Sequence, residues 1–153
     1  MKRQLFVLAT LACVVGAGFV HSSHAGTIFK RGAKWNYYKG NDHPSGGDLE
    51  WTEAEFDDSD WENGPSPFRY GDGSGGTPLN DMGNKYTTMF FRKTFTVANP
   101  DNISEMDFII DYDDGFTVWI NEEEVLNVGG PANPDYDSVA TVGHESGTFE
   151  TFA

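Results

Sequence analysis

Oxygen ligands suited to a metal ion are concentrated in one short acidic segment of this sequence. Asp57, Asp58 and Asp60 lie within four consecutive residues, and Asp72 or Asp81 could add a carboxylate from the loop that follows. Ca²⁺ is bound in proteins by about six to eight such oxygen atoms. The chain lacks an EF-hand pattern, so separate loops would have to supply the ligands. We therefore predict a structural calcium site at Asp57, Asp58 and Asp60. The alternative is that Asp57 caps a turn and the other two face water.

Two further groups of residues have the types needed for proton transfer. Asp111 and the run Asp113-Asp114-Gly115 could form a carboxylate pair like that of a glycosidase, and His144 precedes Glu145. Asp and Gly are also what a tight turn requires, and a single His-Glu pair is a weak metal or acid-base motif. The sequence has no G-x-S-x-G or H-E-x-x-H motif. We therefore predict no catalytic residues and no enzyme activity within this chain.

Tryptophan side chains provide the best candidates for a ligand site. An aromatic ring stacks on the apolar face of a sugar, and nearby acids and amides bind its hydroxyl groups. Trp119 alternates with Phe116 and Val118 along its run, so we expect it on the opposite face and exposed. The alternative is that most tryptophans are core residues. The predicted ligand-binding residues are Trp119, Trp61, Asp72 and Asn80.

These candidate residues lie around a β-rich block that runs from Tyr86 to Val128. Three runs rich in Phe, Ile, Val, Thr and Tyr alternate with period two and are separated by Asn, Asp, Pro and Gly. The pattern predicts three antiparallel strands, each with one core face and one wet face. A further strand is expected at Lys34–Tyr38 and weaker ones at Ser138–Val142 and Thr148–Phe152. The fold class is therefore all-β.

Glycine and proline set the loops of this β protein. A helical turn is expected around Thr52–Phe56, and the acidic run that follows would end it. The passage from Glu62 to Asn84 is so rich in Gly and Pro that we expect one large surface loop without regular elements. Long loops on a β scaffold are where binding residues concentrate.

The first residues are typical of a secretory signal peptide. Lys2 and Arg3 precede an apolar run, Leu5–Val20, and small residues at Ser23 and Ala25 suit cleavage after Ala25. The run is shorter than the roughly 20 residues that a membrane-spanning helix needs. We therefore divide the chain into a signal peptide, 1–25, and one domain, 26–153. The only cysteine, Cys13, leaves with the signal peptide, so the domain has no disulfide.

Charge limits the partners of the exported domain. The full chain has a net charge of −14, and loss of Lys2 and Arg3 takes it to −16. A field of this sign disfavours nucleic acid and anionic membranes. Cations and neutral polar ligands such as glycans remain as partners.

The order of several motifs resembles galactose-binding-like jelly-roll domains of large secreted bacterial proteins, which are related to the sugar-binding domain of family-two glycoside hydrolases. The residues that carry the resemblance are Trp51, Phe56-Asp57-Asp58-Ser59-Asp60-Trp61, Gly64-Pro65, Pro67, Tyr70-Gly71-Asp72-Gly73, Phe90-Phe91-Arg92-Lys93, Phe95, Val97, Tyr112-Asp113-Asp114-Gly115-Phe116, Val118, Ile120-Asn121, Glu124-Val125 and His144-Glu145. It spans roughly Trp35 to Phe152. Asn121-Glu122 stands where the family commonly has Asn-Gly, which weakens the expectation of a two-residue type I′ turn.

The resemblance implies a jelly-roll β-sandwich that binds carbohydrate or serves as a non-catalytic accessory module, outside the cell or in the bacterial periplasm. It also implies that further strands and further domains of a parent chain follow Phe152, so that residues 26–153 alone would be marginally stable. Two other functions stay open. The chain could be the N-terminal part of a multidomain secreted hydrolase, or a protein-binding, adhesive module.

Overall fold

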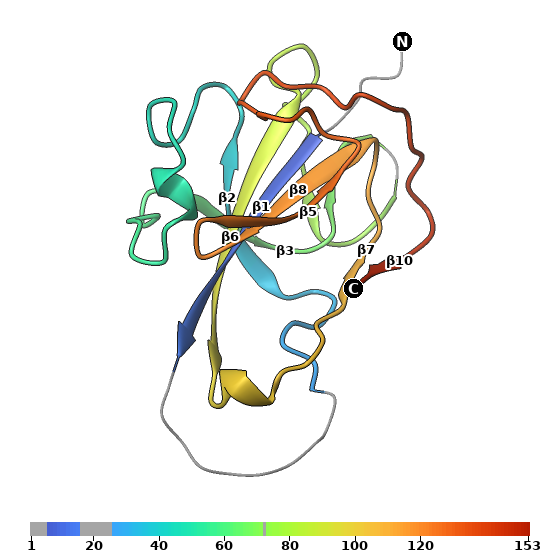
Figure 1. The fold of residues 1–153 in the computed structure, drawn as a ribbon. Helices are drawn as coiled ribbons and strands as arrows, with labels where there is room; N and C mark the ends of the chain where they lie inside the picture. Colours follow the sequence, from blue (N-terminus) through green and yellow to red (C-terminus); the bar gives the residue numbers. More distant parts are fainter. Residues whose placement is uncertain (1–5, 16–25, 72) are drawn as a thin grey trace.

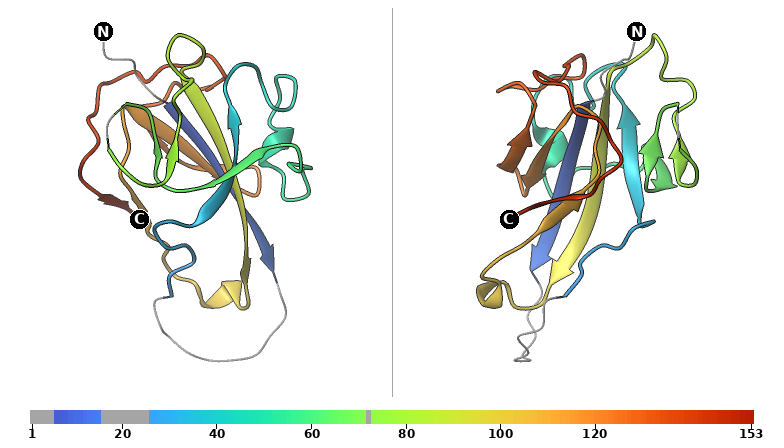
Figure 2. Two further views of the ribbon diagram at one scale, coloured as in Figure 1. Left: turned by 180° about the vertical axis from the view of Figure 1, so that it is seen from behind. Right: turned by 90° about the vertical axis from the view of Figure 1, so that its right-hand side faces the viewer.

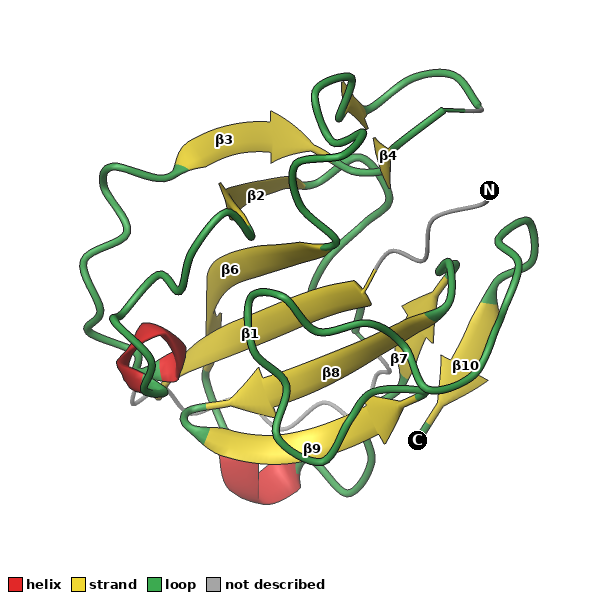
Figure 3. Cartoon of the chain, turned by 90° about the horizontal axis from the view of Figure 1, so that it is seen from above, coloured by secondary structure: helices red, strands yellow, loops and turns green. Residues whose placement is uncertain are grey.

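The computed structural model describes residues 6–15, 26–71 and 73–153, and for 6–15 and Asn102 only the backbone. This part of the chain is mostly β and contains no α-helix. Its largest sheet has the order β3-β2-β6-β1-β8-β9 (Figures 1 and 3). Those strands are β1 (Phe6–Val15), β2 (Lys34–Lys39), β3 (Glu62–Pro65), β6 (Thr88–Val97), β8 (Gly115–Ile120) and β9 (Glu123–Val128). The described strands do not form a closed sandwich.

Two small sheets and two 3-10 turns complete the structure. The first small sheet pairs β7 (Phe108–Ile110) with β10 (Glu150–Phe152), and the second pairs β4 (Phe68–Arg69) with β5 (Thr77–Pro78). The turns are η1 (Glu50–Thr52) and η2 (Pro100–Asn102). Strand β2 was predicted from the sequence and is confirmed. A helical turn was predicted at Thr52–Phe56, and the observed 3-10 turn lies earlier, at Glu50–Thr52. Strand β10 confirms the weak expectation for Thr148–Phe152.

The β8–β9 hairpin is confirmed with a two-residue turn. Asn121 and Glu122 separate the strands and have φ angles of 48° and 73°. Positive φ at both turn residues is the backbone of a type I′ hairpin, which matches the twist of the flanking strands. Glycine suits the second position best, so Glu122 holds an unfavourable conformation there.

Within the central block only β8 and β9 pair with each other, so the expectation of three antiparallel strands is wrong for β6 and β7. Strand β1 lies between β6 and β8 and runs parallel to both. Strand β7 leaves the main sheet and pairs with β10 instead. The turn at Asp113–Asp114, where Asp114 has a φ of 64°, redirects the chain between β7 and β8. Figure 2 shows β1 beside β6 from two further directions.

Both faces of the main sheet are covered over β8 and the first half of β6, so the expected wet face is wrong there. On one face, Phe90 and Trp119 contact Trp51 from the segment after β2. On the other face, Met89 and Phe91 pack with the loop residues Leu79, Met82 and Tyr86, and Phe116 and Val118 pack with β7 and β10. The wet face appears only where β6 passes Lys93, because Thr94 and Thr96 are exposed.

The passage from Glu62 to Asn84 is less irregular than its glycines and prolines indicated. It contains β3, β4 and β5, so the expectation that no regular element survives there is wrong. Strand β3 pairs antiparallel with β2, and β4 pairs parallel with β5. By contrast, the expected strand at Ser138–Val142 is a loop.

The two outer edges of the main sheet carry residues that discourage further pairing. Strand β3 ends at Pro65, which has no backbone N–H to donate. Strand β9 begins with two exposed glutamates, Glu123 and Glu124, and follows Glu122 in the turn. Charged side chains and proline are common on edge strands for this reason.

Only part of the predicted signal peptide falls within the described structure. Residues 6–15 form β1, whereas the proposed cleavage site after Ala25 lies outside the described residues. Among the residues that the structure describes, no helix is long and apolar enough to span a membrane.

Candidate functional site

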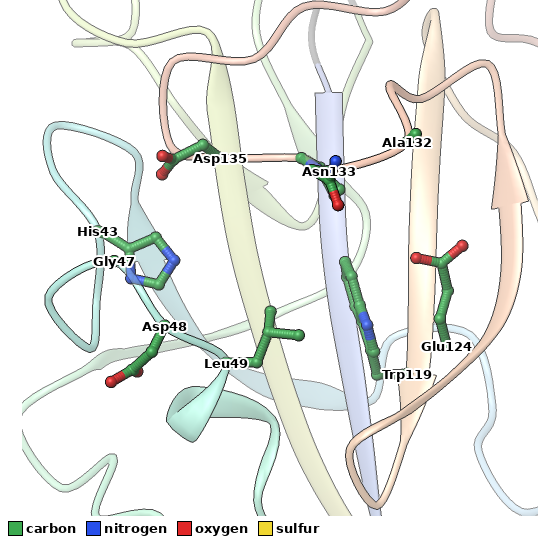
Figure 4. Close-up of a pocket in the computed structure, with 10 residues that line it drawn as sticks. His43, Gly47, Asp48, Leu49, Trp119, Glu124, Ala132, Asn133 and Asp135 are labelled. Atoms are coloured by element: carbon green, nitrogen blue, oxygen red, sulfur yellow. The ribbon is translucent and has the colours of Figure 1, made fainter.

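Two cavities lie beside the main sheet in the described part of the chain. The larger, the Trp119 pocket, has a volume of about 250 Å³. In Figure 4, Trp119 and Glu124 lie across the cavity from His43 and Asp48. The residues that line it are His43, Gly47, Asp48, Leu49, Trp119, Glu124, Ala132, Asn133, Pro134 and Asp135. They come from the loop after β2, from the β8–β9 hairpin and from the loop after β9.

Trp119 is not the exposed side chain that the alternation along β8 indicated. Its exposed fraction is 2%, because Trp51 packs on it with ring centroids 5.4 Å apart. The face of the sheet opposite Phe116 and Val118 is covered by the segment that contains η1, so alternation alone could not predict exposure. Trp119 therefore lines the pocket without offering a free ring face for stacking.

The second cavity, the Trp61 pocket, has a volume of about 200 Å³ and lies at the β2–β3 edge. Tyr37, Tyr38, Lys39, Asn41, Asp60, Trp61 and Glu62 line it. Trp61 is only partly buried, unlike Trp119, and its ring lies 5.5 Å from that of Tyr38. This cavity therefore combines two aromatic rings with carboxylate, amide and ammonium groups.

The charged groups beside the Trp61 pocket form a connected cluster around Lys39. Its Nζ lies 2.9 Å from a carboxylate oxygen of Glu62 and 3.1 Å from one of Asp81. Tyr37 donates a hydrogen bond of 2.8 Å to Glu62, and Tyr86 donates one of 3.0 Å to Asp81. Both carboxylates thus receive one ammonium and one phenol donor.

This cluster sets the protonation states beside the pocket. The hydrogen bond to Glu62 raises the pKa of Lys39, and the hydrogen bond from Lys39 lowers the pKa of Asp81. Burial opposes ionisation of Glu62, but the hydrogen bonds from Lys39 and Tyr37 outweigh it and lower its pKa. Burial and the bond to Glu62 raise the pKa of Tyr37 to about 12. At neutral pH the cluster is therefore an ammonium between two carboxylates.

The acidic segment proposed for calcium is tied to a buried arginine. Asp58 accepts a hydrogen bond of 2.9 Å from Nε of Arg92, and Asp57 accepts one of 3.1 Å from the backbone N–H of Ser59. Hydrogen bonds from Ser59, first from its side chain and then from its backbone N–H, lower the pKa of Asp57. Asp60 is exposed and lines the Trp61 pocket. No group of three or more His, Cys, Asp or Glu side chains among the described residues is arranged to hold a metal ion. The calcium site stays a prediction.

Arg92 was not singled out from the sequence, where it appeared to belong to a wet face. Its side chain is 2% exposed and donates to four groups of the segment from Trp51 to Asp58. Besides Asp58, these are the backbone carbonyls of Trp51, Glu53 (3.0 Å) and Phe56 (3.3 Å). A lone Arg within a Phe-rich run was the only local signal for this role. Arg92 therefore fixes the segment from Trp51 to Asp58 against β6.

The remaining predicted residues do not converge on either cavity. Asn80 is exposed in the loop after β5 and lines neither one, and Asp72 lies outside the described residues. His144 bonds Glu150 at 2.7 Å and the backbone carbonyl of Tyr112 at 3.1 Å, and the bond to Glu150 raises its pKa. Asp114 accepts the N–H of His144 at 3.0 Å. These contacts tie the C-terminal segment to the start of β8.

Comparison with known proteins returns no match: no family model, no curated protein and no solved structure is similar to this chain.

Proposed function

We propose that this chain is an exported, non-catalytic module of the jelly-roll type that binds carbohydrate, and that the Trp61 pocket is its binding site. The observation that carries the proposal is the juxtaposition of a partly exposed tryptophan with hydrogen-bonding side chains in one cavity. An aromatic platform beside a few fixed polar groups is the usual arrangement for a neutral polar ring.

The dimensions of the pocket suit a small ligand. Its volume of about 200 Å³ is below the roughly 300–1,000 Å³ of pockets for drug-sized molecules. One sugar ring, or the end of a longer glycan, is of the appropriate size. Trp61 would stack on the apolar face of the ring, while Asn41, Asp60 and Glu62 accept or donate hydrogen bonds at its hydroxyl groups.

The electrostatics of the pocket favour a neutral ligand over an anion. Lys39 is already paired with Glu62 and Asp81, so it adds no unpaired positive charge to the pocket. The mature chain as a whole is strongly acidic, which repels anionic ligands at long range. A neutral glycan avoids this repulsion and uses the carboxylates as hydrogen-bond acceptors.

The experiment is glycan-array binding of the full chain, followed by titration with the sugar that is retained. Trp61→Ala should weaken binding about tenfold or more, which corresponds to about 1.4 kcal/mol, whereas Trp61→Phe keeps an aromatic face and should lose less. Asn41→Ala tests a hydroxyl contact with little effect on the core, because Asn41 is exposed.

Two controls make the result specific. Trp35→Ala removes a tryptophan of similar burial that packs on the opposite face of β2, and it should leave the affinity unchanged. Asp113→Asn should also leave binding intact. Glycoside turnover by the unmodified chain that disappears in Asp113→Asn would contradict the non-catalytic assignment. A chain that retains no glycan would refute the function, and a Trp61→Ala variant that binds like the unmodified chain would place the site elsewhere.

A further inference from the structure

The centre of the main sheet is completed by a segment that export would remove. Strand β1 pairs with β6 along all its residues, Phe6 to Val15, and with β8 from Phe6 to Leu11. In Figure 3, β1 is the strand between β6 and β8. Without it, β6 and β8 would each face a gap of one strand, which we call the seam. Both strands would then have unpaired backbone groups inside the protein.

The side chains around the seam define what can fill it. One face of the seam is bounded by Met89, Phe91, Phe116 and Val118. The other face is bounded by Phe90 and Trp119, with Trp51 above them. Nearly all of these side chains are apolar and buried, so the seam requires an extended, uncharged segment with side chains on both sides.

Two buried polar atoms on one face of the seam lack a hydrogen-bond partner. They are the hydroxyl of Thr117 and the indole Nε1 of Trp51, whose residues are 0% and 1% exposed. Thr117 is the cross-strand neighbour of position 8 of β1, and Trp51 contacts Phe90, the neighbour of position 8 on the other side. Buried polar groups in proteins are nearly always satisfied. Residues 6–15 therefore pair with both sides of the seam through the backbone, while two buried polar atoms on this face stay without a partner.

We propose that the seam is a strand-acceptor site that holds residues 6–15 only provisionally. After their removal it takes up an uncharged extended segment of another polypeptide, with a hydrogen-bonding side chain such as an amide opposite Thr117. Addition of a strand to unpaired sheet edges obtains affinity from backbone hydrogen bonds and specificity from alternate side chains. The proposal rests on the export part of the proposed function and is independent of carbohydrate binding.

The first experiment tests the register of β1 in the uncleaved chain and uses the natural cysteine of this strand. Cys13 is the neighbour of Phe95 in the β1–β6 ladder. Residues paired across two strands lie on the same face of the sheet, whereas the next residue along a strand lies on the other face. With added oxidant, Phe95→Cys should give at least about tenfold more disulfide to Cys13 than Thr94→Cys, since only position 95 is paired with Cys13 in the register. If Phe95→Cys impairs folding, the pair Val15→Cys and Val97→Cys in a Cys13→Ser chain tests the same register.

Exchange of the strand is tested on the folded full chain with a protease site placed between residues 16 and 25. After cleavage, peptides of sequence 6–15 with identical solubilising lysine tails compete for the seam. The peptide with Leu8→Asn should displace the cut segment at a concentration about tenfold lower than the unmodified peptide, because position 8 is the cross-strand neighbour of Thr117 in the register. Position 9 is the neighbour of Phe91 and Val118 in the register, so the peptide with Ala9→Asn should compete worse than the unmodified one.

Three results would overturn the proposal. The first is equal disulfide yields at positions 94 and 95, and the second is equal competition by the three peptides. The third is a cleaved protein that dimerises through the seam without taking up peptide. Glycan binding by the uncut chain is measured in parallel. Its loss would refute the proposed function, while the exchange result would stand by itself.

Discussion

Removal of the Arg92 side chain should cost this protein a large share of its stability. The guanidinium is buried and donates to the Asp58 carboxylate and to the carbonyls of Trp51, Glu53 and Phe56. In Arg92→Met, a side chain of similar length fills the space, but all four acceptors lose their donor. Breaking a buried charge pair on one side costs about 3–5 kcal/mol. Asp58 retains some access to water, which places the expected loss toward the lower end of that range.

This loss is large compared with the total stability of about 5–15 kcal/mol that a domain has. It should lower the melting temperature by about 10 °C. Arg92→Lys keeps the charge but not the planar set of donors, so its loss should be intermediate. Urea unfolding followed by tryptophan fluorescence is a suitable assay, because Trp51 accepts one of the bonds and lies in the aromatic cluster.

Arg69→Met is the matched control for this experiment. Arg69 is partly buried, and among the described residues its side-chain hydrogen bond goes to the loop carbonyl of Gly75, at 2.8 Å. Its replacement should cost no more than about 1 kcal/mol. If the free energy of unfolding of Arg92→Met lay within about 1 kcal/mol of that of the unmodified chain, the aromatic contacts alone would hold the segment from Trp51 to Asp58. The role given to Arg92 would then be refuted.

Three other predictions concern the turn, the C-terminal segment and calcium. Glu122→Gly should stabilise the hairpin by about 0.5–1 kcal/mol in urea unfolding, because glycine tolerates its positive φ; Glu123→Gly, within β9, should destabilise by a similar amount. The bond to Glu150 raises the pKa of His144, so its stabilising contribution is complete below the ordinary histidine pKa of about 6.5 and is lost as the pH rises through the raised value. Hydrogen exchange of residues 143–152 should therefore speed up, beyond the intrinsic pH effect, between pH 5.5 and 8.5, and Glu150→Gln should remove this dependence. Ca²⁺ should raise the melting temperature relative to EDTA. At a hundredfold excess over its dissociation constant, the bound ion would add about 2.7 kcal/mol to the free energy of unfolding. Identical melting curves would contradict the calcium site.

The sequence predicted the local features of the fold well. Period-two alternation located β2, β6 and the β8–β9 hairpin, since these strands have a repeating pattern of their own. It could not predict strand order, because pairing depends on contacts between distant residues. No pattern in Leu5–Val20 distinguishes a signal peptide from the central strand that β1 forms. The short strand β3 was missed because its residues, Glu62 to Pro65, have no strand pattern and form a strand only by pairing with β2.

The candidate site was predicted less well, for a similar reason. Trp61 lines a cavity, and its role as a ligand-binding residue stays a prediction. The exposure of Trp119 depended on a segment more than 60 residues earlier in the chain. The cluster of Lys39 with Glu62 and Asp81 joins residues of three separate segments, and no local spacing connects them. Residue types alone therefore identified the candidate chemistry, whereas the fold determined which groups meet.

The protected edges of the main sheet have a consequence for behaviour at high concentration. Proline at the end of β3 and the glutamates at the start of β9 make the perimeter a poor template for pairing. Two copies that collide side by side therefore have little to gain, and their negative net charge repels them further. We expect dense solutions of the intact chain to stay clear and fluid and not to form fibrils. Any loss of solubility should then depend on whether the central strands of the main sheet stay paired, and not on its outer edges.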